Sequence, residues 1–471
     1  MKSVGVTQYA APMTDQPVPL LSLLCCPRCG GSLQGEGSLR CAGCAQAFPG
    51  LAGLPWLFAE PDAALGEWRA RTHGFLAGLE SQAARYRAAL TDEVTRAATR
   101  NRLKLLASSC TDHARRLRAL LAPLLEGAPA AAPEIYSALG ATLPAGQGLT
   151  GYYANLHRDW CWGEAENEAS YRLVDAALGE APPGRTLLLG VGAGRLAWDL
   201  NQRRQPEVLV AADINPLFLV AASRLYAGET LELYEFPLAP RDGASHAILR
   251  RLQAPAPAGP GLQLVAADVT RAPFAAGAFD TVITPWLIDV LDDDLAVFAQ
   301  RVNRWLRPGG RWVNSGSLAF SADDPARRYA LEEVREIVAA SGFAPIEPTE
   351  ATVPYLCSPA SRHGRLESVV SFTTEKCTEI EAPTTTRPGP DWLVRGDRPI
   401  PLLPEFQGRQ LELRVLAHVA ALVDGRRSVR DVARVLVEQR LMSEAEAEPT
   451  VRAFLARVHH ESQAGPAGGA V

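Results

Sequence analysis

The chain has 471 residues, of which 47% are hydrophobic and 21% are charged, and its formal net charge is -5. A chain of this length holds about three domains. The net charge gives no global attraction to nucleic acid, and no apolar run reaches the ~18–20 residues that span a bilayer. Residues 1–19 lack the charged and apolar regions of a signal peptide. We therefore expect a cytoplasmic protein that binds neither DNA nor a membrane.

Five of the nine cysteines lie close together near the N-terminus. Two C-x-x-C motifs, separated by eleven residues, can place four thiolates tetrahedrally around Zn²⁺. The expected ligands are Cys26, Cys29, Cys41 and Cys44, because Cys25 breaks the spacing. A redox dithiol needs only one such motif, and four cysteine ligands leave no open position for zinc catalysis. Residues 20–60 resemble the small zinc-ribbon proteins that activate tRNA methyltransferases, so we expect a ribbon with a structural zinc ion.

Residues 61–150 are rich in Ala, Leu, Arg and Glu, which predicts a helical segment. We interpret its basic residues as a solvated helical face rather than an RNA-binding surface, because aromatic residues are sparse among them. These basic residues are Arg96, Arg100, Lys104, Arg115, Arg116 and Arg118. An Ala/Pro-rich linker or cap is expected at 127–133.

Residues 186–200 join a short apolar run, three alternating glycines and an amphipathic pattern. This order is typical of a buried parallel strand, a tight turn and a helix N-terminus. Gly190, Gly192 and Gly194 would let the backbone approach a ligand closely, either a dinucleotide or S-adenosylmethionine (SAM). The dinucleotide fingerprint requires Gly or Ala where this chain has Arg195. The spelling GxGxG instead resembles the first motif of Rossmann-like SAM-dependent methyltransferases.

Two further apolar strands end in carboxylates. The strand at 207–213 ends in Asp213, at about the right distance from the glycines for a ribose diol. The strand at 262–269 ends in Asp268 and Val269, a pair that in methyltransferases usually meets the adenine. The resemblance thus implies a cofactor pocket built by these residues.

A fourth strand at 279–284 ends at Thr284, which we also assign to the cofactor pocket. A fifth follows at 305–314, where the sequence resembles the L-x-P-G-G turn of the same family. The five features in this order imply an α/β fold, with a Rossmann-like methyltransferase sheet within residues 151–380.

Four stretches resemble segments of the carnosine N-methyltransferase family: residues 152–171 with their R-D-W, 234–237, the W-x-N-x-G-x-L at 312–318, and 355–365. The resemblance implies that Arg158 reaches the SAM carboxylate. It also implies that Asn314 and Tyr355 help to orient the substrate. That family carries a histidine near the position of Ser321, so we expect a histidine-related or amine acceptor other than carnosine itself.

Asp289 follows the fourth strand, at the sheet edge where such folds act. A neutral imidazole attacks with its own lone pair and needs the correct tautomer, which a carboxylate accepting from the other N–H can fix. We assign Asp289 to substrate orientation; the alternative is a carboxylate at a helix N-terminus. No N-P-P-Y run follows the fourth strand, which argues against base or glutamine-amide methylation.

A Pro/Thr-rich linker is expected at 381–390, followed by a C-terminal module at 391–462 with helices at 411–422, 428–438 and 445–458. This module resembles the helical portion of winged-helix modules, including those that bind leader peptides in ribosomal-peptide tailoring systems. Its arginines alternate with acidic residues, so a DNA-reading helix is not indicated. We expect it to dock a protein partner or to form a homodimer.

Three functions remain open. The first is N-methylation of a small imidazole- or amine-bearing molecule or peptide. The second is a peptide or natural-product tailoring methyltransferase that captures a macromolecular substrate through its C-terminal module. The third and weaker one is a non-catalytic SAM-binding scaffold, against which the glycines, Asp213 and Asp268 argue.

Overall fold

The computed structural model describes residues 19–90, 96–126, 143, 148–291, 293–320, 324–380, 392 and 398–463. The chain forms two compact units, Met1–Pro383 and Thr384–Val471. The linkers expected at 127–133 and 381–390, and Ser321, lie outside the described residues.

The first unit is organised by a nine-stranded sheet of order β13-β14-β12-β11-β6-β7-β10-β5-β4. Its centre is parallel: β12 (Leu306–Gly316), β11 (Phe279–Pro285), β6 (Arg185–Leu189), β7 (Val208–Asp213) and β10 (Leu262–Ala267). Two antiparallel strands, β14 (Arg365–Glu375) and β13 (Thr349–Tyr355), extend it beyond β12. The expected α/β fold with a Rossmann-like sheet is confirmed, and the five expected strands form its parallel centre.

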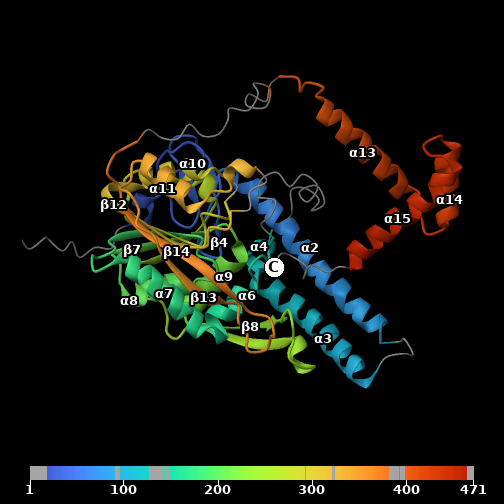
Figure 1. The fold of residues 1–471 in the computed structure, drawn as a ribbon, viewed down its shortest axis with the longest axis horizontal. Helices are drawn as coiled ribbons and strands as arrows, with labels where there is room; N and C mark the ends of the chain where they lie inside the picture. The colour runs from blue at the N-terminus through green and yellow to red at the C-terminus, as the bar shows by residue number, and fades with distance from the viewer. Residues whose placement is uncertain are drawn as a thin grey trace, which may run out of the picture. The chain divides into compact units, whose positions relative to one another are not determined.

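Helices cover both faces of this sheet (Figure 1). One face carries α7 (Glu164–Leu178), α8 (Arg195–Arg203) and α9 (Pro216–Tyr226), and the other carries α10 (Leu295–Trp305) and α11 (Leu331–Ala340). Within β6, Leu188 packs into the first core while Leu187 and Leu189 pack into the second. The strands are therefore buried on both faces, as parallel strands usually are.

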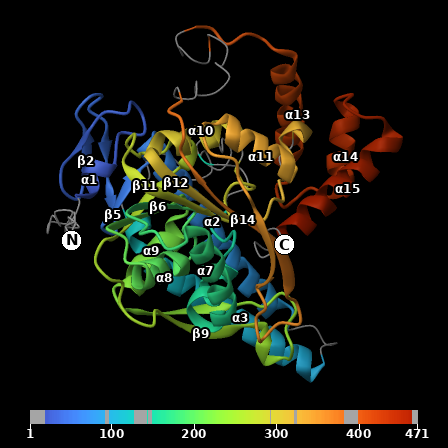
Figure 2. The same ribbon diagram turned by 60° about the vertical axis from the view of Figure 1, so that its left-hand side comes forward.

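The N-terminal ribbon is built into this sheet. After the short helix α1 (Leu20–Leu23) it contains a three-stranded sheet of β1 (Leu33–Gln34), β2 (Leu39–Cys41) and β3 (Ala47–Phe48), followed by β4 (Gly50–Leu51) and β5 (Leu54–Leu57). Strand β5 pairs in parallel with β10, with Trp56 opposite Ala266. Figure 2 shows the ribbon at this edge of the sheet. The ribbon and the methyltransferase-like sheet thus share one core, because Leu23, Cys26 and Phe48 pack with sheet residues.

The expected helical segment forms a hairpin of α2 (Pro61–Ala88) and α3 (Ala97–Leu120), followed by α4 (Ala122–Leu125). Helix α3 packs against an antiparallel pair, β8 (Thr230–Glu235) and β9 (Ile248–Gln253), which lies outside the main sheet. Several basic residues of this segment pair with acids: Arg116 with Asp112 and Glu232, and Arg118 with Glu80. Part of the expected basic face is therefore paired with acidic side chains of the same unit.

Two buried histidines lie where α3 meets β8. His113 is on α3 and His157 ends the short helix α6 (Ala154–His157). Their rings contact the ring of Tyr153 at centroid distances of 5.5 and 5.2 Å. Burial lowers the pKa of His113 to about 4 and that of His157 to about 3. Both imidazoles are therefore neutral in the folded protein at neutral pH.

These histidines predict loss of stability in acid. The unfolded chain binds their protons near pH 6.5, whereas the folded chain does so only near pH 4 and below, so the free energy of unfolding should fall as pH drops through this window. The expected slope is ~1.4 kcal/mol per pH unit for each histidine. Urea unfolding from pH 7 to 5 checks this. The His113→Gln/His157→Gln double variant should show a flatter dependence, while the exposed control His73→Gln should keep the wild-type slope.

The second unit is helical in its described part, with α13 (Pro404–Ala421), α14 (Val429–Glu438) and α15 (Glu444–Gln463). A small core of Val419, Val432, Leu436 and Val451 holds these helices together. Ser428 caps α14 in a reciprocal pair with Asp431. The three expected helices are confirmed, and residues 398–463 contain no strand of a wing. Among the described helices of the whole chain, none has the length and apolar character needed to cross a membrane.

Candidate active site

A cavity of about 220 Å³ opens where the parallel strands end at their carboxyl termini. Residues after β6, β7, β10 and β11 form one wall, and residues 152–174 together with Tyr355 form the opposite wall. Ligands of open α/β sheets bind at this edge. The cavity therefore occupies the position expected for the active site.

The glycine-rich turn after β6 forms the floor of the cavity. Gly192 has φ +55°, and a Cβ built there meets no atom within 4 Å because it would point into open space. Gly194 has φ +97°, and a Cβ there would lie 2.5 Å from the hydroxyl of Tyr226. Gly190 and Gly192 line the cavity, whereas Gly194 packs on α9 at the start of α8. The open space at Gly192 fits a ligand that lies directly on the backbone.

Asp213, at the end of β7, fixes this turn. Its carboxylate accepts hydrogen bonds from the amides of Gly192 and Asn215, both at 2.8 Å. Asp213 lines the cavity, and burial raises its pKa. A carboxylate has about four lone-pair sites, so it keeps the capacity to accept from a pair of hydroxyl groups. This arrangement fits a ribose.

Asp268 and Val269 lie across the cavity after β10. One carboxylate oxygen of Asp268 accepts from the amide and the hydroxyl of Thr270, both at 2.8 Å, which caps a short turn at Val269–Arg271. No other described residue donates to the second oxygen of Asp268. That oxygen and the side chain of Val269 at the cavity wall fit a flat heterocycle with an amino group.

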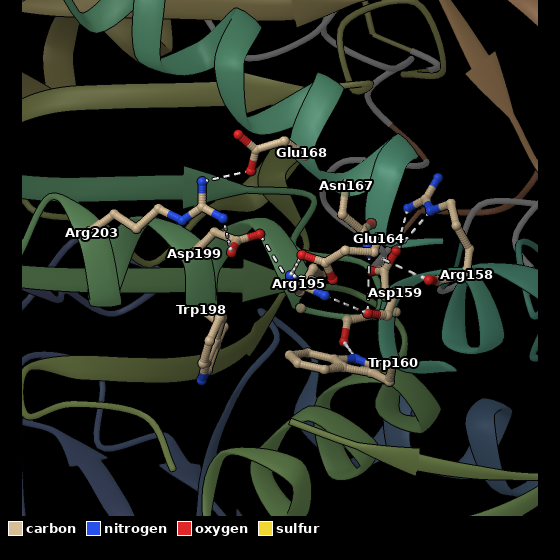
Figure 3. A network of polar contacts seen from close by, with 12 residues as sticks. Arg158, Asp159, Trp160, Glu164, Asn167, Glu168, Arg195, Trp198, Asp199 and Arg203 are labelled. Carbon is tan, nitrogen blue, oxygen red and sulfur yellow. Dashed lines mark hydrogen bonds and ion pairs between the residues drawn. The ribbon is translucent and has the colours of Figure 1, made fainter. Parts of the chain in front are cut away.

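The R-D-W segment forms one turn of π-helix, η1 (Arg158–Trp162), and Figure 3 shows the polar network around it. Trp160 donates its indole N–H to the carbonyl of Ala193 in the glycine turn, at 2.7 Å. Arg195, on α8, donates to the carbonyl of Asp159 and forms ion pairs with Glu164 and Asp199. This buried arginine holds η1 against the glycine turn. The sequence showed only that Arg195 does not match the dinucleotide fingerprint, and it did not predict this structural role.

Arg158 faces the cavity from the roof. Its guanidinium pairs with Asp159 at 2.7 Å and lies 5.4 Å from the ring centroid of Tyr355. Opposite charge nearby and stacking on an aromatic face hold this guanidinium in place. The cavity has two halves: a cofactor-like half around Gly192, Asp213 and Asp268, and an aromatic half around Trp286 and Tyr355. Arg158 lies between these two halves.

The aromatic half contains residues that sequence reasoning did not assign to the site. Trp286, directly after β11, has φ +50°, and its ring lies 5.2 Å from that of Tyr355. A Cβ at Gly316 would lie 2.8 Å from the backbone of Trp286, so only glycine permits this close approach. Other lining residues of this half are Tyr152, Asn155, Ser315 and Val369. In the sequence, Trp286 and Tyr355 stand where strands end, but aromatic residues at strand ends do not by themselves indicate a cavity.

Asp289 lies in the turn between β11 and α10, beside this aromatic half. Its carboxylate accepts from the hydroxyl of Ser317 and from the amide of Ala319. Burial raises the pKa of Asp289. Burial also raises the pKa of Tyr152, with contributions from Tyr355 and from the charge of Asp289. Helix α10 is capped by Asp294 instead, so the alternative of a helix N-terminal carboxylate does not apply to Asp289.

Four expected site residues, Gly194, Thr284, Asp289 and Asn314, are not among the residues that line the cavity. Thr284 and Asn314 are fully buried on neighbouring strands, where the Thr284 hydroxyl donates to the amide oxygen of Asn314 at 2.9 Å. The indole of Trp312 donates to the same Thr284 hydroxyl. Thr284 and Asn314 lie within the sheet behind the cavity wall, and we assign them no direct contact with a cofactor or a substrate.

The four expected cysteines form one cluster in the ribbon. The sulfur atoms of Cys26, Cys29, Cys41 and Cys44 lie within 4.8 Å of one another, with 3.4 Å between Cys29 and Cys41. The amide of Cys44, and then that of Gly43, donate to the Cys41 sulfur and help to lower the pKa of Cys41 to about 6. Tetrahedral zinc with ~2.3 Å bonds separates its sulfurs by ~3.8 Å, so this cluster can hold a metal ion.

Cys25 has a different role. Its thiol donates to the carbonyl of Phe274 at 3.3 Å, and its amide donates to the carbonyl of Pro273. Cys25 therefore fastens the ribbon to the loop after β10 and is not part of the four-cysteine cluster.

A model of the methyltransferase domain family matches residues 187–313, which contain the glycine turn, Asp213, Asp268 and Asp289. This part of the chain is a methyltransferase domain. A curated relative is carnosine N-methyltransferase of Mus musculus, which is 24% identical over 213 residues. The match covers 40% of this chain and 52% of the mouse protein, so the chain spans about half the length of that relative.

Solved methyltransferase structures are also similar to this domain. The N-methyltransferase NodS of Bradyrhizobium japonicum with S-adenosylhomocysteine is 17% identical, covers 48% of this chain and 97% of its own, and gives a TM-score of 0.31. A complex of the Haloferax volcanii Trm112 methyltransferase activator with a methyltransferase is 13% identical, with coverages of 48% and 97% and a TM-score of 0.32. These scores are too low to refine the assignment.

Proposed function

We propose that this protein is a SAM-dependent N-methyltransferase that methylates an imidazole or amine nitrogen of a histidine-related small molecule or peptide. The observation that carries the proposal is the continuity of the cavity. Its cofactor-like half, with Asp213 and Asp268, opens directly into an aromatic half bounded by Trp286 and Tyr355. A donor and an acceptor bound in these halves would meet in one water-poor space.

The cofactor-like half suits SAM, which when bound supplies an electrophilic methyl group on a sulfonium. Asp213 would accept from the ribose hydroxyls, and Asp268 with Val269 would hold the adenine. The turn at Gly190 and Gly192 would carry the methionine portion. Arg158 would pair with the carboxylate of SAM. Such fixed binding aligns the reacting atoms before transfer, which is the main contribution required for an in-line displacement.

Asp289 would act on the acceptor. A neutral imidazole uses the lone pair of one nitrogen, while its other nitrogen carries a proton. A carboxylate that accepts from this N–H fixes the reactive tautomer, and it can take the proton once the methylated ring is cationic. Burial raises the pKa of Asp289, which makes its carboxylate a better proton acceptor than an ordinary aspartate. Trp286 and Tyr355 would flank the ring and exclude water.

The likeness to a carnosine N-methyltransferase supports the imidazole class of acceptor. Carnosine itself remains disfavoured, because Ser321 stands where we expect that family to offer histidine. The test is mass spectrometry after incubation with methyl-labelled SAM and a panel of imidazoles, amines and histidine-containing peptides. We expect label on a ring or amine nitrogen. Label only on oxygen, sulfur or carbon acceptors, or rapid turnover of carnosine, would reject the proposal in its present form.

The second candidate is a tailoring methyltransferase that captures a larger substrate through residues 384–471. The observation in its favour is that α13 exposes several large apolar side chains, including Leu411, Leu413 and Val415. Deleting residues 384–471, a separate compact unit, should leave methylation of a free small acceptor within about twofold. Methylation of an acceptor that is part of a larger molecule bound by residues 384–471 should fall at least about tenfold. The same labelled-SAM assay measures both rates. Equal losses on both substrates would exclude a capture role.

We propose that the four-cysteine cluster binds one structural Zn²⁺ per chain. Replacing Cys29 with serine should abolish zinc binding and unfold the ribbon, because metal binding and folding are coupled in such sites. Elemental analysis should give about one zinc per wild-type chain and none in the variant. The control Cys377→Ser changes an exposed cysteine outside the cluster and should retain zinc. Zinc-free wild-type protein with freely titratable thiols would reject the metal site.

A further inference from the structure

A second hollow lies beside the aromatic half of the active site. It is lined by the loop after β13, by the first two residues of β14 and by one residue of the loop between β8 and β9: Cys357, Ser358, Ser361, Arg362, His363, Gly364, Arg365, Leu366 and Arg241. We refer to it as the basic hollow. Three arginines and a histidine line it, and no Asp or Glu is among its lining residues. A concave surface of this composition favours an anion.

The basic hollow adjoins the active-site cavity through Tyr355. This residue lines the active-site cavity. The guanidinium of Arg365, which lines the basic hollow, lies 4.8 Å from the centroid of the same ring. The two spaces are therefore linked by the contact between Tyr355, which lines the cavity, and Arg365, which lines the hollow.

The loop that forms the hollow is rigidly held. Glu166, buried on α7, accepts from the amides of Leu356 at 2.9 Å and Cys357 at 2.8 Å. Leu356 has φ +54°, a backbone conformation that costs energy in a leucine. A Cβ at Gly364 would lie 2.8 Å from the sulfur of Cys357, so the loop folds tightly on itself. Strain held by buried contacts is common at ligand sites.

The loop between β8 and β9 completes the wall. Pro240 and Ser361 form a β-bridge, and the amide of Arg241 donates to the carbonyl of Ala360. Arg362 donates its guanidinium to the carbonyls of Pro240 and Arg241. The hollow is thus preformed by two loops that are distant in sequence, which lowers the ordering cost of binding.

The nearby carboxylates are already engaged. Glu367 pairs with Arg365, and Glu235 pairs with Arg250 and with the Ser358 hydroxyl. Asp242 accepts from Ser245 and Ala244. Among the described residues, none forms an ion pair with Arg241. Its exposed guanidinium therefore remains available to an external anion.

From this geometry we infer that the basic hollow binds a carboxylate or phosphate group carried by the methyl acceptor. The inference rests on the proposed function and narrows its substrate class to imidazoles or amines that bear an anionic group. Arg241 and His363 would contact the anion, while Arg365 would place it against Tyr355. The nitrogen to be methylated would lie on the other side of that ring, beside Asp289.

The test uses the full-length protein with SAM present and compares matched probes by calorimetry. The pairs are N-acetylhistidine with N-acetylhistamine, histidinol phosphate with histidinol, and histidine peptides with a glutamate or a glutamine one to three residues away. We expect the anionic member of at least one pair to bind roughly tenfold more tightly. The pair with the larger ratio distinguishes carboxylate from phosphate recognition.

The variant Arg241→Gln should remove most of that preference without weakening the neutral member. The control Arg115→Gln, which removes an exposed arginine on α3, should retain it. Equal affinities within every pair, or no binding of any anionic probe, would overturn the inference. The labelled-SAM assay on the same probes keeps the two proposals separate. Methylation without an anion preference would reject anion binding by the basic hollow, but it would still support the proposed function.

Discussion

Replacing Asp213 with alanine is expected to weaken SAM binding by about a hundredfold. The carboxylate holds the amides of Gly192 and Asn215 and is proposed to accept from the ribose. Its loss leaves buried donors without partners, at a cost of about 1–3 kcal/mol for each group, which corresponds to roughly one to two decades in affinity for each group that the cofactor does not satisfy. Calorimetry with SAM measures the change directly.

Two controls keep this result specific to the pocket. Asp213→Asn preserves the shape and one acceptor oxygen, so its affinity for SAM should lie between those of the wild type and Asp213→Ala. Asp324→Ala removes an exposed cap on a short turn and should bind SAM as the wild type does. If Asp213→Ala binds SAM as tightly as the wild type, the assignment of the β7 carboxylate to the cofactor is wrong.

Replacing Asp289 with asparagine is expected to lower kcat by about a hundredfold while the Kd for SAM stays unchanged. Asparagine can present an N–H where the carboxylate accepts, so it would favour the unreactive tautomer of an imidazole. Loss of a positioned proton acceptor typically costs a factor of ~10²–10⁴. Steady-state rates with the best acceptor of the panel, together with SAM calorimetry on the same variant, give both numbers.

Ser317→Ala is the matched comparison, because it removes one hydrogen bond to Asp289 and leaves the one from Ala319. We expect a decrease of a few-fold in kcat. A wild-type kcat in Asp289→Asn would assign substrate orientation to another group, whereas a parallel loss of SAM affinity would show that Asp289 supports the whole pocket.

The parallel sheet and the cofactor-like half follow closely from local sequence. Short apolar runs that end in glycines or aspartates predict buried strands and their carboxyl ends, and these ends meet at one edge of any parallel sheet. Gly192, Asp213 and Asp268 therefore come together without further information. The two C-x-x-C motifs fix the cysteine cluster in the same local manner.

The faces of the strands could not be predicted in this way. The second half of β12, residues 312–316, is buried on both sides, so its sequence shows no alternation of polar and apolar residues. Trp312 and Asn314 consequently gave no sign that they point behind the cavity wall rather than into it. Trp286 and the basic hollow depend on contacts such as that of Glu166 with Leu356, which are 190 residues apart, and local patterns do not report them.

Titration of the full-length protein with SAM, and separately with NAD, tests the central claim most directly. We propose that the glycine turn, Asp213 and Asp268 hold an adenosine-containing ligand. SAM and NAD share the adenosine portion and differ in the group beyond the ribose. We expect one SAM to bind per chain, and no measurable heat with NAD. Binding of NAD in preference to SAM, or no binding of SAM to folded, zinc-loaded protein, would contradict it.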